Sequence, residues 1–447
     1  MDETSQKNDA LNVWVIEPHE PLIFRDGRPF NLKPGIIAQS LPFPFPSTTT
    51  GGVRSQAGLN EQGVFVYKSK DQLETLKQLK VRGPLLVQIT HHDEGDGREK
   101  EDTLEWFVPA PADALLLKPG DDALKPGDDA LKPGDDASSE IKALLKRLVP
   151  IKTTVNELTD LTSVHEDKGK PPLHLVGMQQ YISGKPVEKP PRYWKWHVFQ
   201  EWLLNPEENK IKEWSDLGIV GLAQEERTHV GMDRENHKGK DGALFATRGM
   251  EFVAFNEDEG LQKAHPLGLA MILEKDAQPV PRENFATFGG ERRIVRWRNY
   301  TSNTLSCPTE LIEKIVVGED KVWSCRMILL TPAYFKEGFY PTEIQKEQDG
   351  VKPIIKAIAI QRPEVISGWD LVSRVPKKTR RLAPAGTVFF LELQGEQEAI
   401  RNWVRKYWLQ CISDNDDNNE PQDCNDGFGL AVIGTWDGQL HEMKIGE

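Results

Sequence analysis

Cysteines, paired metal-binding motifs and long apolar runs are all scarce in this sequence. The 447 residues include four cysteines, and none of them forms a CxxC pair, so a zinc site is not expected. Few and scattered cysteines indicate a reduced, cytoplasmic protein. No run of about 18 apolar residues occurs, so no membrane-spanning helix is expected. The polar, acidic N-terminus is also unlike a signal peptide.

Basic residues are in deficit as well. The sequence has 56 Lys and Arg against 69 Asp and Glu, a net charge of -13, whereas nucleic-acid-binding proteins usually carry a basic footprint. The deficit is not uniform along the chain. Arg374–Arg381 holds five basic residues and no acidic one, and Arg282–Arg298 holds five arginines against two acids. Each segment is either a solvated surface or a phosphate-binding track.

Strand-like and helix-like segments alternate irregularly along the chain. This pattern predicts an α+β fold in which helices cover one face of each sheet. We expect helices over 138–148 and 193–204, and a projecting hairpin with strands 228–232 and 242–255 and a charged tip over 233–241. Three tandem LKPGDDA copies cover 117–137. Pro and Gly in each copy exclude a continuous helix, so we interpret the repeats as an acidic surface insertion.

The stretch SLPFPFPSTTTGGVRS, residues 40–55, begins as neither a strand nor a helix. Its three prolines cannot donate hydrogen bonds to a sheet, and they break a helix. We therefore expect a stiff extended arm, which Phe43 and Phe45 anchor in apolar surface. The hydroxyl residues that follow are expected to cap a helix running through about Arg54 to Leu59.

Six motifs occur together in an order that resembles one known family. They are EPHEPLIFRDGRPF, AQSLPFPFPSTTTGGVRS, RTHVGMDRENHKGKDGALFATRGMEF, GGERRIVRW, PKKTRRLAPAGTVF and GFGLAVIGTW. As a set they resemble the third subunit of the type III-B CRISPR effector, the Cmr complex, which is a repeat-associated mysterious protein (RAMP). They span Glu17 to Trp436. The LKPGDDA repeats and the acidic tract over 413–423 depart from the family pattern.

The resemblance implies two ferredoxin-like (RRM-like) domains with long insertions. The N-terminal domain would span residues 11–275, with the low-complexity insertion over 113–137 and the hairpin, 228–255, as a thumb-like element. The C-terminal domain would span residues 276–447 and contain the RAMP glycine-rich loop, 427–434.

The resemblance also implies RNA binding, and the chemistry of the matched motifs suggests which residues contact the RNA. Arginine pairs with phosphate through two hydrogen bonds, a helix start offers free amides, and glycine lets the backbone approach a phosphate closely. At each position the structural alternative is an ordinary turn, a capped helix, a mobile loop or a solvated surface. The expected RNA contacts are Arg25, Arg28, Ser47, Thr48, Gly51, Arg54, His229, Arg234, Arg292, Arg293, Lys377, Lys378, Arg380, Arg381, Gly427 and Gly429.

By this resemblance the protein would hold the 5′ repeat-derived tag of the CRISPR RNA and contact the large polymerase-like subunit and the backbone RAMP subunits. A backbone subunit cuts RNA in this family, so we expect no enzyme activity, catalytic residue, metal or cofactor here. The matched motifs contain His19, His229 and His237 in no recognisable acid–base arrangement. A guide-processing endoribonuclease and a purely structural connector remain the alternatives.

Overall fold

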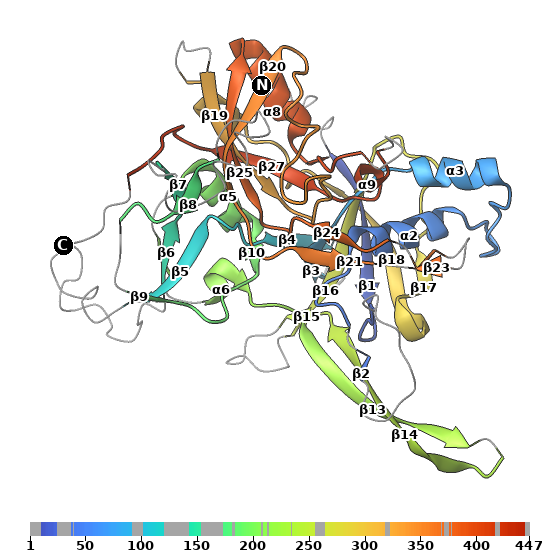
Figure 1. The fold of residues 1–447 in the computed structure, drawn as a ribbon. Helices are drawn as coiled ribbons and strands as arrows, with labels where there is room; N and C mark the ends of the chain where they lie inside the picture. The colour runs from blue at the N-terminus through green and yellow to red at the C-terminus, as the bar shows by residue number, and fades with distance from the viewer. Residues whose placement is uncertain are drawn as a thin grey trace, which may run out of the picture.

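The computed structural model combines antiparallel sheets with helices, so the expected α+β class is confirmed (Figure 1). In the described residues, no helix is long and apolar enough to cross a membrane. The structure describes residues 10–24, 37–38, 40–91, 102–119, 143–152, 173–180, 184–206, 209–211, 214–233, 235–254, 264–317, 322–367, 369–370, 375–376, 378–415 and 421–442.

A nine-stranded sheet is the largest element of the described chain, and its last two strands lie beyond the domain boundary expected at residue 275. All its pairs are antiparallel. The strand order is β12 (Gly218–Ile219), β10 (Tyr193–Lys195), β4 (Thr103–Pro109), β3 (Val81–Thr90), β16 (His265–Leu273), β1 (Leu11–Pro18), β18 (Arg293–Ser302) and β17 (Asn284–Phe288), with β15 (Val253–Ala254) beside β16.

A second, five-stranded antiparallel sheet comes from the C-terminal part of the chain. Its order is β20 (Val351–Ala359), β25 (Val388–Gly395), β19 (Val322–Leu329), β27 (Leu430–Thr435) and β26 (Gln410–Cys411). A four-stranded sheet has the order β11 (Asn209–Ile211), β6 (Ala143–Arg147), β5 (Ala114–Pro119) and β9 (Gly184–Pro186). Three two-stranded sheets pair β7 (Val149–Ile151) with β8 (Leu175–Gly177), β21 (Glu364–Ile366) with β24 (Arg380–Leu382), and β22 (Trp369–Asp370) with β23 (Val375–Pro376).

Helices pack on both faces of the large sheet, which corrects the expectation that they cover one face of each sheet. On one face, α2 (Pro46–Ala57) and α3 (Lys70–Gln78) enclose a core with β1, β3 and β16. On the other face, α5 (Trp196–Leu204), α7 (Thr309–Ile315) and α8 (Gln397–Tyr407) share one continuous core with the second sheet. The helix expected over 193–204 is present as α5 from Trp196, and its aromatic residues are buried there. The short helices are α6 (Trp214–Leu217), η2 (Gly290–Arg292) and α9 (Gln422–Asn425).

A buried ion pair joins the second sheet to α5 and to the segment before β5. Arg326 of β19 and Asp113, which precedes β5, form a salt bridge between two fully buried side chains. The guanidinium also donates to the Trp202 carbonyl at 2.7 Å and to the Thr435 carbonyl at 2.8 Å, and the Trp202 indole donates to Asp113 at 3.1 Å. Because its hydrogen bonds reach four segments, this pair fixes their relative positions.

The described chain corrects two expectations near the repeats. Asp113 was assigned to the surface insertion over 113–137, but it is fully buried, and Leu116 and Leu117 of β5 are also buried. The helix expected over 138–148 is wrong where it can be seen, because residues 143–147 form strand β6, which pairs with β5. Backbone pairing with a neighbouring strand overrides the helical side-chain pattern. Residues 120–142 lie outside the described residues.

The expected projecting hairpin is present and longer than predicted. β13 (Ala223–Asp233) and β14 (Lys238–Glu251) pair from Ala223–Glu251 to Asp233–Lys238, with a bulge between Val230 and Met232. The pair extends well away from the body of the protein (Figure 1), and β2 (Ile37–Ala38) runs parallel to β14. The tip is shorter than the expected 233–241, because the Asp233 carboxylate accepts hydrogen bonds from the amides of Glu235 and Asn236 and so closes the turn.

The four cysteines are free, in keeping with the expected reduced state. Burial raises the pKa of the Cys307 and Cys424 thiols to about 12. Both thiols therefore stay protonated at neutral pH, which makes them poor nucleophiles.

We predict that Arg326→Met lowers the free energy of unfolding by about 3–5 kcal/mol, because it leaves the Asp113 carboxylate buried and unpaired. The double variant Arg326→Met/Asp113→Leu should recover most of that loss. Urea denaturation measures both. Lys314→Met, which removes an exposed pair with Glu310, is the control and should shift the midpoint little. A double variant as unstable as the single one would contradict the explanation.

Candidate nucleic-acid interface

The proline arm leads into α2, and its two phenylalanines are anchored as predicted. The Phe43 ring centroid lies 5.4 Å from that of Tyr193 on β10. Phe45 packs against a small apolar cluster of Ile366, Leu382 and Phe428. The arm therefore links the large sheet to the β21–β24 pair and to the last loop of the chain.

The hydroxyl residues after the arm do not cap the helix, which corrects that expectation. α2 already begins at Pro46, with Phe45 at the N-cap and no side-chain cap, because proline suits the first helical position. The Thr50 hydroxyl instead donates to the Asp426 carbonyl at 2.7 Å. Ser47 and Thr48 lie half-buried in the first turn, and no side-chain hydrogen bond is seen for either among the described residues.

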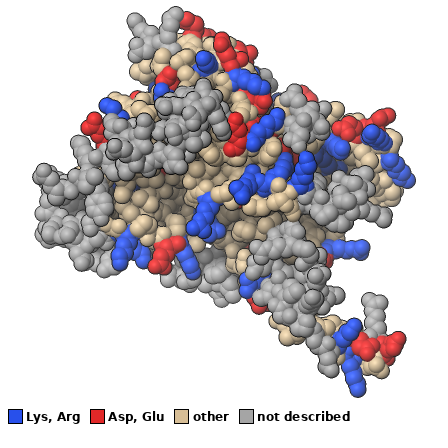
Figure 2. Space-filling view, viewed as in Figure 1, with Lys and Arg blue, Asp and Glu red and all other residues tan. Residues whose placement is uncertain are grey.

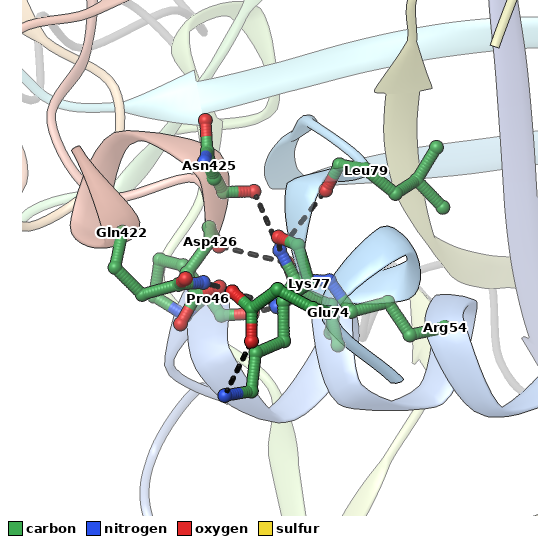
Figure 3. A network of polar contacts seen from close by, with 10 residues as sticks. Pro46, Arg54, Glu74, Lys77, Leu79, Gln422, Asn425 and Asp426 are labelled. Atoms are coloured by element: carbon green, nitrogen blue, oxygen red, sulfur yellow. Dashed lines mark hydrogen bonds and ion pairs between the residues drawn. The ribbon is translucent and has the colours of Figure 1, made fainter. Parts of the chain in front are cut away.

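Arg54 is turned inward and joins three segments (Figure 3). Its guanidinium pairs with Asp426 at 2.5 Å and donates to the carbonyls of Lys77, Leu79 and Asn425 at 2.7, 2.9 and 3.3 Å. The side chain is 14% exposed. This geometry makes Arg54 a tie between α2, the end of α3 and the loop after α9, and does not favour a direct phosphate contact.

The glycine-rich loop is buried and used internally. Gly427 and Gly429 have φ of +94° and +82°, a region that favours glycine. A Cβ on Gly427 would lie 2.6 Å from the Gly83 carbonyl oxygen, and one on Gly429 would lie 2.8 Å from the Ser413 amide. The amides of both glycines donate to carbonyls within the chain. The geometry therefore gives the two glycines a packing role and does not support an open phosphate cradle.

Two adjacent glycines in α2 differ in their surroundings. A Cβ on Gly52 would lie 2.6 Å from the Phe288 ring, whereas a Cβ on the exposed Gly51 would meet nothing within 4 Å. Glycine within a helix costs roughly 0.5–1 kcal/mol relative to alanine. Packing within the chain explains Gly52 but not Gly51, whose bare backbone is open to an approaching molecule.

The basic segment at β24 is partly exposed beside the arm. Lys378 and Arg381 are exposed, while Arg380 pairs with Asp423 at 2.6 Å and lies over the Tyr334 ring at 4.8 Å. Figure 2 shows Lys and Arg gathered near the centre of this face, where Figure 1 places β21 and β24. Lys377 lies outside the described residues.

The second basic segment reaches α2 from the opposite side, through Phe288 and Gly52. Arg292 is exposed, with a positive φ of 54°. Arg293 is buried and pairs with Glu291 at 2.7 Å. Both basic segments therefore contact the arm–α2 unit, although they are far apart in the sequence. We call this unit with Arg292, Lys378 and Arg381 the α2 surface.

Four further expected contacts, namely His229, Arg25, Arg28 and Arg234, also lie outside the α2 surface as defined. His229 lies on the hairpin, where its Nε2 is 2.9 Å from the Thr247 hydroxyl and its ring stacks on Phe245 at 5.1 Å. The opposite side of the hairpin exposes the apolar side chains of Val230, Met232 and Leu244. Arg25, Arg28 and Arg234 lie outside the described residues.

Sequence reasoning missed an ion network at the margin of the large sheet. Arg298 pairs with Asp102 at 2.5 Å, and His91 lies 3.0 Å from Asp102 and 3.3 Å from Glu17. Burial alone would raise the pKa of Asp102, but the His91 hydrogen bond and the Arg298 charge lower it overall. The sequence offered one hint of this network, the alternation along β18, which places every second residue on one face of the sheet. Among the described residues, no cluster of three or more His, Cys, Asp or Glu side chains is arranged to hold a metal ion.

Comparison with known proteins identifies the chain as a CRISPR effector subunit of the type III-B Cmr class. A family model described as CRISPR-associated protein (Cas_Cmr3) matches residues 14–436, so the chain belongs to this family, as its ordered motifs indicate. No curated protein matches.

Two solved chains are similar to this one at 15% identity. They come from cryo-EM structures of the type III-B Cmr-beta bound to cognate target RNA, one of them also with AMPPnP in state 1. The TM-scores are 0.38 for the AMPPnP structure and 0.37 for the other. The matches cover 88% and 85% of this chain and 87% and 86% of the solved chains. At these scores the likeness adds nothing to the assignment.

We predict that Arg54→Met lowers the free energy of unfolding by about 2–3 kcal/mol, because charged hydrogen bonds inside the chain are lost. Asp426→Asn should weaken the same contact, and a double-mutant cycle by urea denaturation measures their coupling. Lys77→Met, at an exposed side chain paired with Glu74, is the control. Unchanged stability with weakened RNA binding in Arg54→Met would instead indicate a direct phosphate contact.

Proposed function

We propose that the protein is a non-catalytic RNA-binding subunit of a type III-B effector that holds the 5′ repeat-derived tag of the guide. The supporting observation is the charge of the α2 surface. Arg292 and Arg381 are exposed and have no carboxylate partner among the described residues, although the whole chain carries -13. Unpaired cations that persist in an acidic protein favour a polyanionic ligand.

The arm and α2 supply the rest of the proposed seat. Ser47 and Thr48 lie at a helix start, where the helix dipole favours an anion. Pro46 has no N–H and the Thr48 amide donates to the Phe45 carbonyl at 2.9 Å, so the two hydroxyls are the groups offered to a phosphate. The bare backbone at Gly51 lets a sugar–phosphate strand approach closely. Because packing already holds Phe43 and Phe45 in place, the proline arm loses little conformational entropy when the RNA strand binds.

Strand order supports the proposal of two ferredoxin-like domains. In that fold the four strands, numbered along the chain, run 2-3-1-4 across an antiparallel sheet. β3, β16, β1 and β18 follow this order, and so do β20, β25, β19 and β27. On this proposal the first domain continues to Ser302, so the boundary lies later than residue 275.

We assign the remaining contacts by the same reasoning. The projecting hairpin would lie across the guide as a thumb, using its exposed Val230, Met232 and Leu244, with His229 and Arg234 near the backbone of the RNA. The large polymerase-like subunit and the backbone RAMP subunits would be the protein partners, in the cytoplasm.

We predict that Lys378→Ala/Arg381→Ala weakens binding of the full chain to tag-containing RNA. The slope of log affinity against log salt should become shallower by about 1.4, because each phosphate contact on a single strand contributes about 0.7. Fluorescence anisotropy over a salt series measures this. Lys352→Ala/Arg405→Ala, at two exposed positions on the second sheet and α8, should leave the slope unchanged. Equal slopes for all three proteins would argue against the α2 surface.

We predict that the purified chain leaves repeat RNA intact, with or without Mg²⁺. The support is that His229 is held by Thr247 and Phe245, and the His19 ring lies 5.3 Å from Phe285. Gel analysis of labelled RNA is the measurement. Cleavage that disappears in His19→Ala or His229→Ala but persists in His197→Ala would establish the endoribonuclease alternative.

A further inference from the structure

A large aromatic side chain is exposed on β17, the edge strand of the nine-stranded sheet in the described chain. Phe285 is 62% exposed, although burying a phenylalanine stabilises a fold by roughly 1.5–3 kcal/mol. The Arg296 guanidinium carbon lies 5.8 Å from its ring centroid, and the His19 ring lies 5.3 Å away at 56°. Ile294, on the neighbouring strand, is also 47% exposed.

Two arginines near Phe285 are not engaged in ion pairs. The nearby carboxylates are held elsewhere: Glu20 accepts from the Ile294 amide at 3.1 Å, Glu283 from the Asn299 amide at 2.8 Å, and Glu291 pairs with Arg293 at 2.7 Å. Arg292 and Arg296 are both exposed, and neither has a carboxylate partner among the described residues. The exposed ring therefore has beside it a guanidinium that is available to a ligand.

This combination fits an unpaired nucleotide better than a protein segment. A base stacks on an aromatic face, and an adjacent arginine can stack on the base or bind its phosphate. A protein partner that covered Phe285 would have to desolvate Arg296 and supply an acid for it. RNA satisfies both requirements with one repeating unit.

We infer that Phe285, flanked by His19 and Arg296, is a stacking platform for an unpaired base of single-stranded RNA. The inference rests on the proposed function and extends it to a second contact point. Phe288, which touches Gly52 of α2, is three residues further along the same strand, or about 10 Å away. Because side chains alternate along a strand, Phe285 points to the face of β17 opposite Phe288 and α2. β17 is an edge strand, so an RNA strand held at the α2 surface reaches this platform around the edge of the sheet.

Binding of the full chain to two labelled RNAs of equal length tests the platform. One RNA is an unpaired sequence, and the other has the same backbone with abasic sites. Phe285→Ala should weaken binding to the first RNA roughly 5- to 150-fold, the range that corresponds to loss of one stacked base. It should leave the abasic RNA unchanged. Phe285→Trp should restore binding of the first RNA. Phe65→Ala, at the other phenylalanine that is exposed among the described residues, is the matched control and should change neither affinity.

The outcomes separate this inference from the function beneath it. Failure of the wild-type chain to bind either RNA overturns the proposed function. Two outcomes overturn the platform alone when the wild-type chain binds RNA normally. In the first, Phe285→Ala binds both RNAs as tightly as the wild type does. In the second, Phe285→Ala loses the same amount of affinity for both RNAs. A Phe285→Ala chain that binds both RNAs normally but no longer assembles with the other effector subunits shows that a protein covers the ring, which also overturns it. Equal melting temperatures confirm that the variants are folded.

Discussion

The buried Arg326 guanidinium is the constraint on which the rest of the structure depends. A charge removed from water must be satisfied in every direction, and Arg326 finds its acceptors on Asp113, Trp202 and Thr435. These lie before β5, on α5 and at the end of β27. The second sheet is thereby held to α5, which packs on β4 and β10 of the large sheet. The two sheets share one continuous core.

Arg54 ties α2 to distant segments, as Arg326 ties the second sheet to α5 and to the segment before β5. These two arginines show why the net charge of a sequence does not give the charge of its solvent-facing surface. Both count as positive charges in the sequence, yet both are consumed by internal acceptors. What faces solvent is the remainder after these internal pairings, and at the α2 surface it includes the exposed Arg292, Lys378 and Arg381 although the chain as a whole is acidic.

Local patterns in the sequence predicted those parts of the fold that depend on neighbouring residues. α5, the hairpin and the anchored arm follow from helical spacing, alternation or proline chemistry. Features that depend on distant partners were missed. β6 was mistaken for a helix because its strand partner lies across the repeats. Gly427 was taken for a phosphate contact because its close approach to Gly83 has no local signal. Phe285 was overlooked because a phenylalanine in a strand normally indicates core, and its exposure depends on the sheet ending there.

The tie between α2 and the loop after α9 has a consequence for how the protein is made. Arg54 and its partner Asp426 are separated by 372 positions in the chain. A ribosome releases the chain from its N-terminus, and domains fold as they emerge. α2 is therefore synthesised early but is not tied to its partner until Asp426 has left the ribosome. A translation product that stops before Asp426 lacks this tie.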